Sequence, residues 1–393
     1  MRVIALAAAA TLLAAQPAPS SRTVIAVGTA LDGRGGVLHE TRLVIEGGKI
    51  AAIDPKAAPV DYDLRQRTVM PGWIDTHVHL NWHFDDQHKS VSGGEPADLA
   101  ALFTAEDAWT TLQGGFTTVQ SVGAAIDGPV RDRINHGLLP GPRVLTSLRQ
   151  ITSRSGDPDA LRAMVKQLKQ DGADVIKLFA TSGLGAGGDQ TMTDAQIETV
   201  CGEAKAQGLR SVVHAIGDKG ARASILAGCT AIEHGPFVSD ETLELMVQHG
   251  TFFDPNLLVL HNYLDNRTGF PSFSEETLAT LEKGIAPMAD ALRRARAHHV
   301  KIVFGTDAVA GAHGRNAEEF VYRVKEAGEK PMDVLVSATS LSAESLGMGQ
   351  ALGVLAPGYA ADIVATDGSL LDDITAVRRV RFVMKGGKVY RSQ

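Results

Sequence analysis

The chain has 393 residues, 44% of them hydrophobic, a length that can bury one large core and a smaller one. The formal net charge of −7 gives no electrostatic basis for binding nucleic acid. The two cysteines, Cys201 and Cys229, are too few for a disulfide framework, and we expect free buried thiols rather than a pair.

Residues 1–20 have the form of a secretory signal peptide. The basic Arg2 precedes an apolar, alanine-rich run of about a dozen residues, and small residues follow. This run is too short to cross a bilayer as a stable helix, and no later segment is apolar enough to anchor the mature chain. We therefore exclude residues 1–20 from the fold and expect a periplasmic or secreted protein.

Short strands are predicted near both ends of the remaining chain. The predicted strands are 23–27, 41–46, 49–53, 361–366, 377–385 and 388–390. The pair Gly47-Gly48 is a hairpin signal between two of them. We predict one small β-sandwich domain composed of residues 21–70 and 351–393.

Residues 71–350 alternate apolar strands with helices. The eight candidate strands are 73–79, 116–121, 143–147, 173–179, 209–214, 230–233, 251–254 and 300–305. Thr193 and Gln196 form a capping box at the start of one helix, and Asp157-Pro158 begins another that ends at Gly172. Largely apolar strands separated by helices are typical of a closed parallel barrel. We predict an α/β fold, a (β/α)8 TIM barrel.

Six potential metal ligands fall at the C-terminal ends of these strands. They are His77, His79, Lys177, His214, His234 and Asp307. His77 and His79 lie two apart in a strand, so their imidazoles face the same side. Taken alone, Lys177 in its apolar strand could belong to a buried ion pair. Because barrel enzymes carry their chemistry at this end of the strands, the six together predict a metal site.

The sequence around these residues resembles the amidohydrolase superfamily, in its binuclear branch with a carboxylated lysine. The segments that carry the resemblance are PGWIDTHVHL, GGFTTVQSVG, GADVIKLFATSG, VVHAIGD, AIEHGPF, IVFGTDA, HGRNAEEF and LGVLAPGYAADIV. They cover nearly the whole mature chain. Within the superfamily the chain is similar to imidazolonepropionase-like hydrolases and to dipeptidases of Xaa-Pro or Xaa-Arg type. That group is related to hydrolases of amide-linked toxins such as ochratoxin.

The resemblance implies two divalent metal ions, for which zinc is expected, and a role for each ligand. His77, His79 and Asp307 would hold the more buried ion, and His214 and His234 the other. Lys177, N-carboxylated, would bridge the two. A hydroxide shared by the metals would attack an amide carbonyl, with Asp307 and His214 as the catalytic residues. Asp307 would pass the proton to the leaving nitrogen.

Substrate contacts are predicted from the loops that follow the strands. The candidates are Arg149, His261, Tyr263, His313 and Arg315, with Leu257, Leu258, Phe270 and Phe273 as an apolar wall. An arginine could hold a free α-carboxylate, so we expect a dipeptide or an N-acyl amino acid as substrate. Two departures from the relatives bear on this expectation. The loop 148–157 is short and lacks their substrate-contacting histidine, and Gln120-Ser121 stands where they often have Arg-Asp.

Other functions remain open from the sequence. The same metal core could serve a lactone or phosphotriester hydrolase. A mononuclear deaminase is disfavoured, since Lys177 is present and Gly217 occupies the position where that branch usually has an acidic residue. A third alternative is an exported metal-binding protein without catalysis. As partners we expect a small-molecule substrate and a second copy of the chain in a homo-oligomer, with neither nucleic acid nor membrane.

Overall fold

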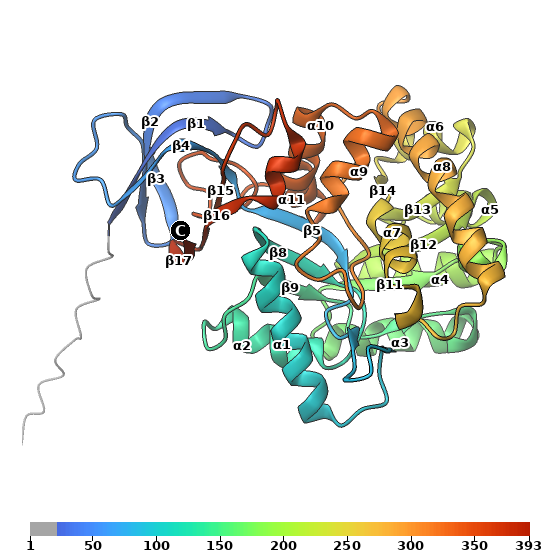
Figure 1. The fold of residues 1–393 in the computed structure, drawn as a ribbon. Coiled ribbons are helices and arrows are strands. Elements are labelled where there is room, and N and C mark those ends of the chain that lie inside the picture. The colour runs from blue at the N-terminus through green and yellow to red at the C-terminus, as the bar shows by residue number, and fades with distance from the viewer. Residues whose placement is uncertain (1–21) are drawn as a thin grey trace, which may run out of the picture.

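The computed structural model describes residues 22–393, so the predicted signal peptide lies outside the described residues. Seven strands from both ends of the chain form one sheet in the order β17-β16-β15-β4-β1-β2-β3. Figure 1 shows blue N-terminal strands beside red C-terminal ones on one side of the molecule. The strands are β1 (Thr23–Leu31), β2 (Val37–Glu46), β3 (Lys49–Ile53), β4 (Tyr62–Pro71), β15 (Ile363–Thr366), β16 (Val380–Lys385) and β17 (Lys388–Ser392). A two-layer sandwich stays a prediction.

The two ends of the chain are joined directly in this sheet. β15 pairs antiparallel with β4, with Ile363 opposite Pro71. The sheet buries its own apolar cluster, which includes Ile25, Leu43 and Phe382. Since β5 begins two residues after β4 ends, this sheet fixes where the chain enters the region that carries the predicted ligands.

That region contains two parallel sheets. One has the order β5-β8-β9 and the other β10-β11-β12-β13-β14. Their strands are β5 (Trp73–Val78), β8 (Phe116–Ser121), β9 (Arg143–Thr146), β10 (Gln150–Ile151), β11 (Val175–Phe179), β12 (Arg210–Gly217), β13 (Ala231–Phe237) and β14 (Phe252–Asp254). A two-stranded hairpin, β6 (His83–Phe84) and β7 (Ser90–Val91), follows β5. Seven of the eight predicted strands are thus present within a few residues of their expected bounds.

The eighth predicted strand, Val300–Gly305, is not a strand in the structure. The segment nevertheless bonds to both sheets: the Phe253 N–H donates to the Lys301 carbonyl at 3.0 Å, and the Thr76 N–H donates to the Phe304 carbonyl at 2.8 Å. The regular ladder is interrupted because the Gly305 N–H donates to a side chain, the carboxylate of Asp254. The segment lies between β14 and β5, while a fully closed barrel stays a prediction.

Helices connect the parallel strands and surround them in Figure 1. They are α1 (Ala97–Gln113), α2 (Asp127–Asn135), α3 (Pro158–Gln170), α4 (Asp194–Ala206), α5 (Asp218–Leu226), α6 (Asp240–His249), α7 (Leu257–Asp265), α8 (Glu275–Ala297), α9 (Glu318–Ala327), α10 (Pro331–Val336) and α11 (Ser342–Ser345). The predicted caps are confirmed: Asp157 caps α3, and Thr193 and Gln196 form the capping box of α4. None of the described helices is long and apolar enough to span a bilayer.

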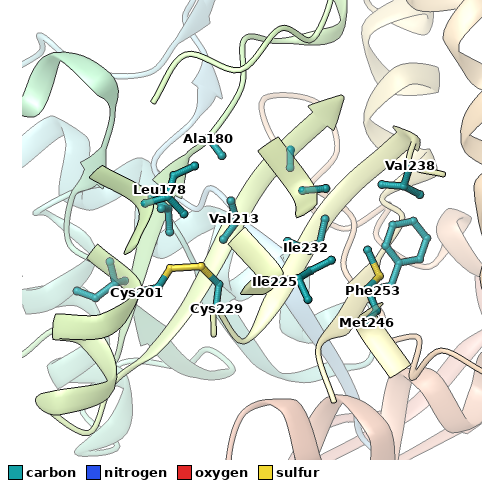
Figure 2. Close-up of a cluster of buried hydrophobic side chains, with 14 of the residues drawn as sticks. Leu178, Ala180, Cys201, Val213, Ile225, Cys229, Ile232, Val238, Met246 and Phe253 are labelled. Atoms are coloured by element: carbon teal, nitrogen blue, oxygen red, sulfur yellow. A yellow bond between two sulfur atoms is a disulfide. The ribbon is translucent and has the colours of Figure 1, made fainter. Parts of the chain in front are cut away.

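The expectation of free thiols is wrong, since Cys201 and Cys229 form a disulfide (Figure 2). Cys201 lies on α4, and Cys229 follows α5 just before β13. The helices flank one strand, β12, and this brings the two Cα atoms to 5.2 Å although the residues are 28 apart in sequence. The bond lies inside the largest apolar cluster, among strand residues such as Val213 and Ile232. Sequence spacing alone does not show that proximity.

Removing this disulfide should destabilise the fold. Closing a loop of 28 residues restricts the unfolded chain, and on that argument the double variant Cys201→Ala/Cys229→Ala loses about 3–4 kcal/mol of unfolding free energy. Urea unfolding followed by tryptophan fluorescence measures the difference. Reductant should destabilise the native protein and leave the double variant unchanged. Equal unfolding midpoints for the oxidised native protein and the double variant would contradict the stabilising role.

Candidate active site

Three predicted ligands converge at the ends of the parallel strands. His77 and His79 come from the end of β5, and Asp307 follows the segment that lies beside it. The Oδ1 atom of Asp307 is 3.1 Å from the Nε2 atom of His79 and 3.4 Å from the Nε2 atom of His77. The three ligand atoms lie within 4.8 Å of one another, which is close enough to surround one cation.

Lys177, in the middle of β11, points at the same group. Its Nζ atom is 3.3 Å from the Nε2 atom of His77, and its side chain is 1% exposed. Among residues 22–393 no carboxylate lies within ion-pair distance of this amine, so the alternative of a buried ion pair has no partner there. Burial lowers the pKa of Lys177 although Glu233 and Asp307 oppose the shift. The amine is therefore less basic than an ordinary lysine.

His214 and His234 complete the predicted set from the neighbouring strands β12 and β13. Their ring centroids are 4.7 Å apart, and the ring of His234 lies 5.4 Å from that of His77. Burial lowers the pKa of His214 to about 4 and that of His234 well below its usual value. Both rings are therefore neutral near pH 7, which is the form that binds metal ions.

The backbone is strained at two of the ligands. His234 has φ 71° and Asp307 has φ 52°, a left-handed region that is costly for residues other than glycine. At His234 the strain breaks the side-chain alternation of β13. Glu233 and His234 therefore both face His77, one in contact with its Nδ1 atom and the other beside its ring. Such strain clusters at functional sites in proteins.

A buried layer of carboxylates lies beneath the ligands, and our sequence analysis did not assign it. Glu233 Oε2 lies 2.7 Å from His77 Nδ1, and Asp254 accepts from the Thr76 hydroxyl at 2.6 Å. Asp75 accepts from the Thr306 hydroxyl at 2.7 Å. Burial raises the pKa of Asp75 and of Glu233 to about 7. Asp75 and Glu233 could have been found from the sequence, because each is a carboxylate within an apolar strand beside a predicted ligand. Carboxylates are rarely buried without a partner.

Beside the ligands is a cavity of about 410 Å³. His214, His234 and Asp307 contribute to its wall. The other lining residues are Gly183, Leu184, Gly185, Ala186, Ile216, Val259, Leu260, Tyr263, Phe273, Thr277, Leu281 and Met288. A volume in this range suits a small organic molecule. The ligands thus lie at the edge of a space where a substrate could sit.

Of the five predicted substrate contacts, only Tyr263 lines this cavity. His261 stacks on Tyr322 and bonds to Glu326, because it lies on the face of α7 that packs against α9. The other three are engaged elsewhere: Arg149 with Asp171, Arg315 with Asp265, and His313 with the Trp82 carbonyl. The structure therefore does not bring these four residues to the cavity.

The predicted apolar wall is also only partly in place. Phe273 lines the cavity, whereas Leu257, Leu258 and Phe270 are buried in the surrounding core. Val259 and Leu260 line the cavity instead of Leu257 and Leu258. All four residues belong to the first turn of α7, where the helical rotation turns successive side chains in different directions.

Buried neutral imidazoles, a carboxylate and a lysine brought together by neighbouring parallel strands are typical of the class of metal-dependent hydrolases. Residues 68–390 match the family model described as "Amidohydrolase family". The chain belongs to this family, and the resemblance to the amidohydrolase superfamily drawn from the sequence is confirmed. The expectation of a hydrolase acting on amide C–N bonds is confirmed as well.

Individual relatives cover almost the whole chain. Ochratoxinase from Aspergillus niger is 27% identical over 424 aligned residues, which span 94% of this chain and 86% of that protein. A solved structure of a Xaa-Pro dipeptidase with methionine bound in its active site is 30% identical, with a TM-score of 0.86 over 95% of this chain and 100% of that one. A prolidase complexed with N-methylphosphonate-L-proline is 26% identical, with the same TM-score and the same coverage.

We expect Glu233 to orient His77 for metal binding. A carboxylate that accepts the Nδ1–H leaves the Nε2 lone pair directed at the cation, and losing such a partner typically lowers metal affinity about 10–100-fold. Glu233→Gln should therefore release metal to a competing chelator more readily than the native protein. Glu319→Gln is the matched control, because Glu319 is equally buried but bonds to the Leu258 N–H. Equal metal affinity in the native protein and both variants would contradict the orienting role.

Proposed function

We propose that the protein is an exported binuclear metal hydrolase that cleaves an amide bond of a dipeptide or an N-acyl amino acid, an aromatic toxin such as ochratoxin included. The observation that carries the proposal is the convergence of six potential ligands beside one cavity, three of them within 4.8 Å of one another. The parallel strands and the segment 300–308 would then form one barrel with the site at its C-terminal end.

The donors suit a pair of divalent ions. His77, His79 and Asp307 would hold one ion, His214 and His234 the other, and a carboxylated Lys177 both. Neutral imidazoles and carboxylates with open positions favour zinc. Two such ions would supply an activated water near neutral pH and would polarise the scissile carbonyl.

Lys177 is suited to carboxylation. The neutral amine attacks the carbon of carbon dioxide, an N–C bond forms, and one amine proton leaves. Because burial already lowers the pKa of Lys177, the neutral form that reacts is more accessible than in an exposed lysine. The product is an anion, so the amine beside His77 is replaced by a group that attracts metal ions.

Asp307 would move the proton. Its Oδ1 atom lies beside His77 and His79, and the residue also lines the cavity. It would accept a proton from the attacking water and deliver it to the amine nitrogen as the C–N bond breaks. This step leaves a carboxylic acid and an amine as products.

Two observations support the choice of substrate and location. The relatives include proteins named as an ochratoxinase, a Xaa-Pro dipeptidase and a prolidase. The disulfide between Cys201 and Cys229 suits an oxidising compartment, in line with the signal-like residues 1–20.

The proposed function is tested by quantifying bound metal and screening substrates on the same preparation. We expect about two metal ions per chain and hydrolysis of dipeptides or N-acyl amino acids. Activity confined to lactones or phosphotriesters would refute the amide assignment while keeping the metal site. Bound metal with no hydrolysis of any of these substrates would favour a binding protein.

Lys177→Ala should lose most of the bound metal and most of the activity, because the bridging anion is gone. Short carboxylic acids such as acetate or propionate should restore part of both, since they can occupy the vacated space. Lys177→Arg serves as the control: it fills the space but cannot be carboxylated, so added acids should not rescue it. A Lys177→Ala protein with two metals and full rate would rule out the bridging role.

Asp307→Asn should lower kcat by about 10²–10⁴-fold, the usual contribution of general acid–base catalysis. The amide keeps a ligand oxygen but cannot take the proton, so metal content should fall less than in Lys177→Ala. Steady-state kinetics and metal analysis on the same sample separate the two effects. Near-native turnover would leave Asp307 as a dispensable ligand.

A further inference from the structure

Apart from the proposed ligands, the lining of the cavity is largely apolar. The apolar side chains include Leu184, Ile216, Leu260, Leu281 and Met288. Together with Phe270 they belong to one buried hydrophobic cluster, against which Tyr263 and Phe273 pack. Among the residues that line the cavity, the ionisable side chains are His214, His234, Asp307 and Tyr263, so none is a lysine or an arginine.

Close packing builds this apolar wall. Gly284 on α8 has no side chain, and a Cβ atom there would lie 2.2 Å from Leu184, so the loop 183–188 can pack directly on the helix. On the other side, the rings of Tyr263 and Phe273 meet edge to face with centroids 5.0 Å apart. Tyr263 also meets Phe270 edge to face at 4.8 Å. Such mutually packed aromatic rings give a wall of defined shape.

A charged substrate group would be unfavourable in this space. It would lose its hydration without gaining an ionic partner, whereas an apolar group gains by leaving water. We propose that the cavity is the specificity subsite of the enzyme. It receives an uncharged apolar or aromatic group attached to the scissile amide, while any carboxylate of the substrate stays outside it. This inference rests on the proposed function and specifies its substrate class.

Chain-length dependence gives the first test. Two series of amides are compared with the metal-loaded protein, one lengthened on the acyl side by single methylenes and one on the amine side. Burial of each methylene should raise kcat/KM about fourfold in one of the series until the cavity is filled. Replacing the terminal methyl by a carboxylate in a chain of the same length should lower kcat/KM at least tenfold. Rates independent of length in both series, or equal rates for methyl and carboxylate, would overturn the subsite.

A variant designed to reverse the preference for an uncharged chain end gives the second test. Thr277 lines the cavity from α8 and is only partly buried, so Thr277→Arg places a cation at the wall without burying it fully. This variant should raise the preference for the carboxylate-ended chain over the methyl-ended one about 10–100-fold, the value of a hydrogen bond to a charged group. Thr280→Arg is the matched control, on the same helix but outside the lining, and should keep the native preference. An equal change in both variants would overturn the assignment of the wall.

Failure of the proposed function is distinguishable from failure of the subsite. If no amide is cleaved, the same series can be titrated into the metal-loaded protein by calorimetry, where affinity should still rise with apolar length. Affinity that does not change with length would overturn the subsite whatever the activity. Leu281→Ala, which enlarges the cavity, should shift the chain length that gives the highest kcat/KM or affinity to a longer chain. An unchanged best chain length in a folded variant would count against the subsite.

Discussion

The site depends on the backbone pairing between β5 and the segment 304–308. The Asp307 N–H donates to the His77 carbonyl at 2.8 Å, and the His79 N–H donates to the Ala308 carbonyl at 2.8 Å. These bonds hold Asp307 against the two histidines of β5, although 228 residues separate His79 from Asp307 (307 − 79). The left-handed conformation of Asp307 is tolerated because both neighbouring segments are fixed.

The buried carboxylates beneath the ligands explain how this irregular segment is kept in place. Asp75 accepts from both the backbone N–H and the hydroxyl of Thr306, and from the Asn316 amide at 2.8 Å. Asp254 accepts from the Gly305 N–H. Each carboxylate therefore holds part of the segment 304–308 and also lies next to the ligands. Asp75 accepts from the His77 N–H at 3.1 Å, and a carboxylate oxygen of Asp254 lies within 4.8 Å of His77 and Glu233. Removal of one partner would leave a buried polar group unsatisfied, which costs about 1–3 kcal/mol.

The sequence predicted those features that depend on local pattern. Seven parallel strands and the caps of α3 and α4 follow from apolar runs and from the residues that end them. The six proposed ligands do lie on or next to these strands and the segment 300–308, although Lys177, His214 and His234 lie within their strands rather than at the ends. The sequence also predicted an eighth strand over 300–305 that the structure does not contain, because the Gly305 and Thr306 N–H groups donate to side chains in place of a regular ladder.

Contacts between separate helices and strands also could not be predicted from the sequence. The disulfide depends on how α4 and α5 pack beside β12, and the orientation of His261 depends on which face of α7 meets α9. Loop position alone suggested Arg149 and Arg315 as substrate contacts. In the structure Arg149 forms an ion pair with Asp171 at 2.7 Å, and Arg315 forms one with Asp265 at 2.8 Å. The ionic partner of a charged loop residue depends on which side chains lie nearby in the folded protein, so neither strand ends nor sequence spacing reveal that partner.

The polar ligands and the apolar cavity serve separate parts of recognition. Imidazoles, carboxylate and lysine gather on one wall, where His214, His234 and Asp307 reach the cavity. Most of the apolar lining comes from α7, α8 and the loop 183–188, which contribute none of the proposed ligands, whereas Ile216 shares β12 with His214. Because α8 carries none of the proposed ligands, changes in α8 can alter which group binds without moving the atoms that act on the amide. Charge interactions beside apolar lining are stronger than in water, so the apolar residues around the cavity also strengthen the action of the polar ones.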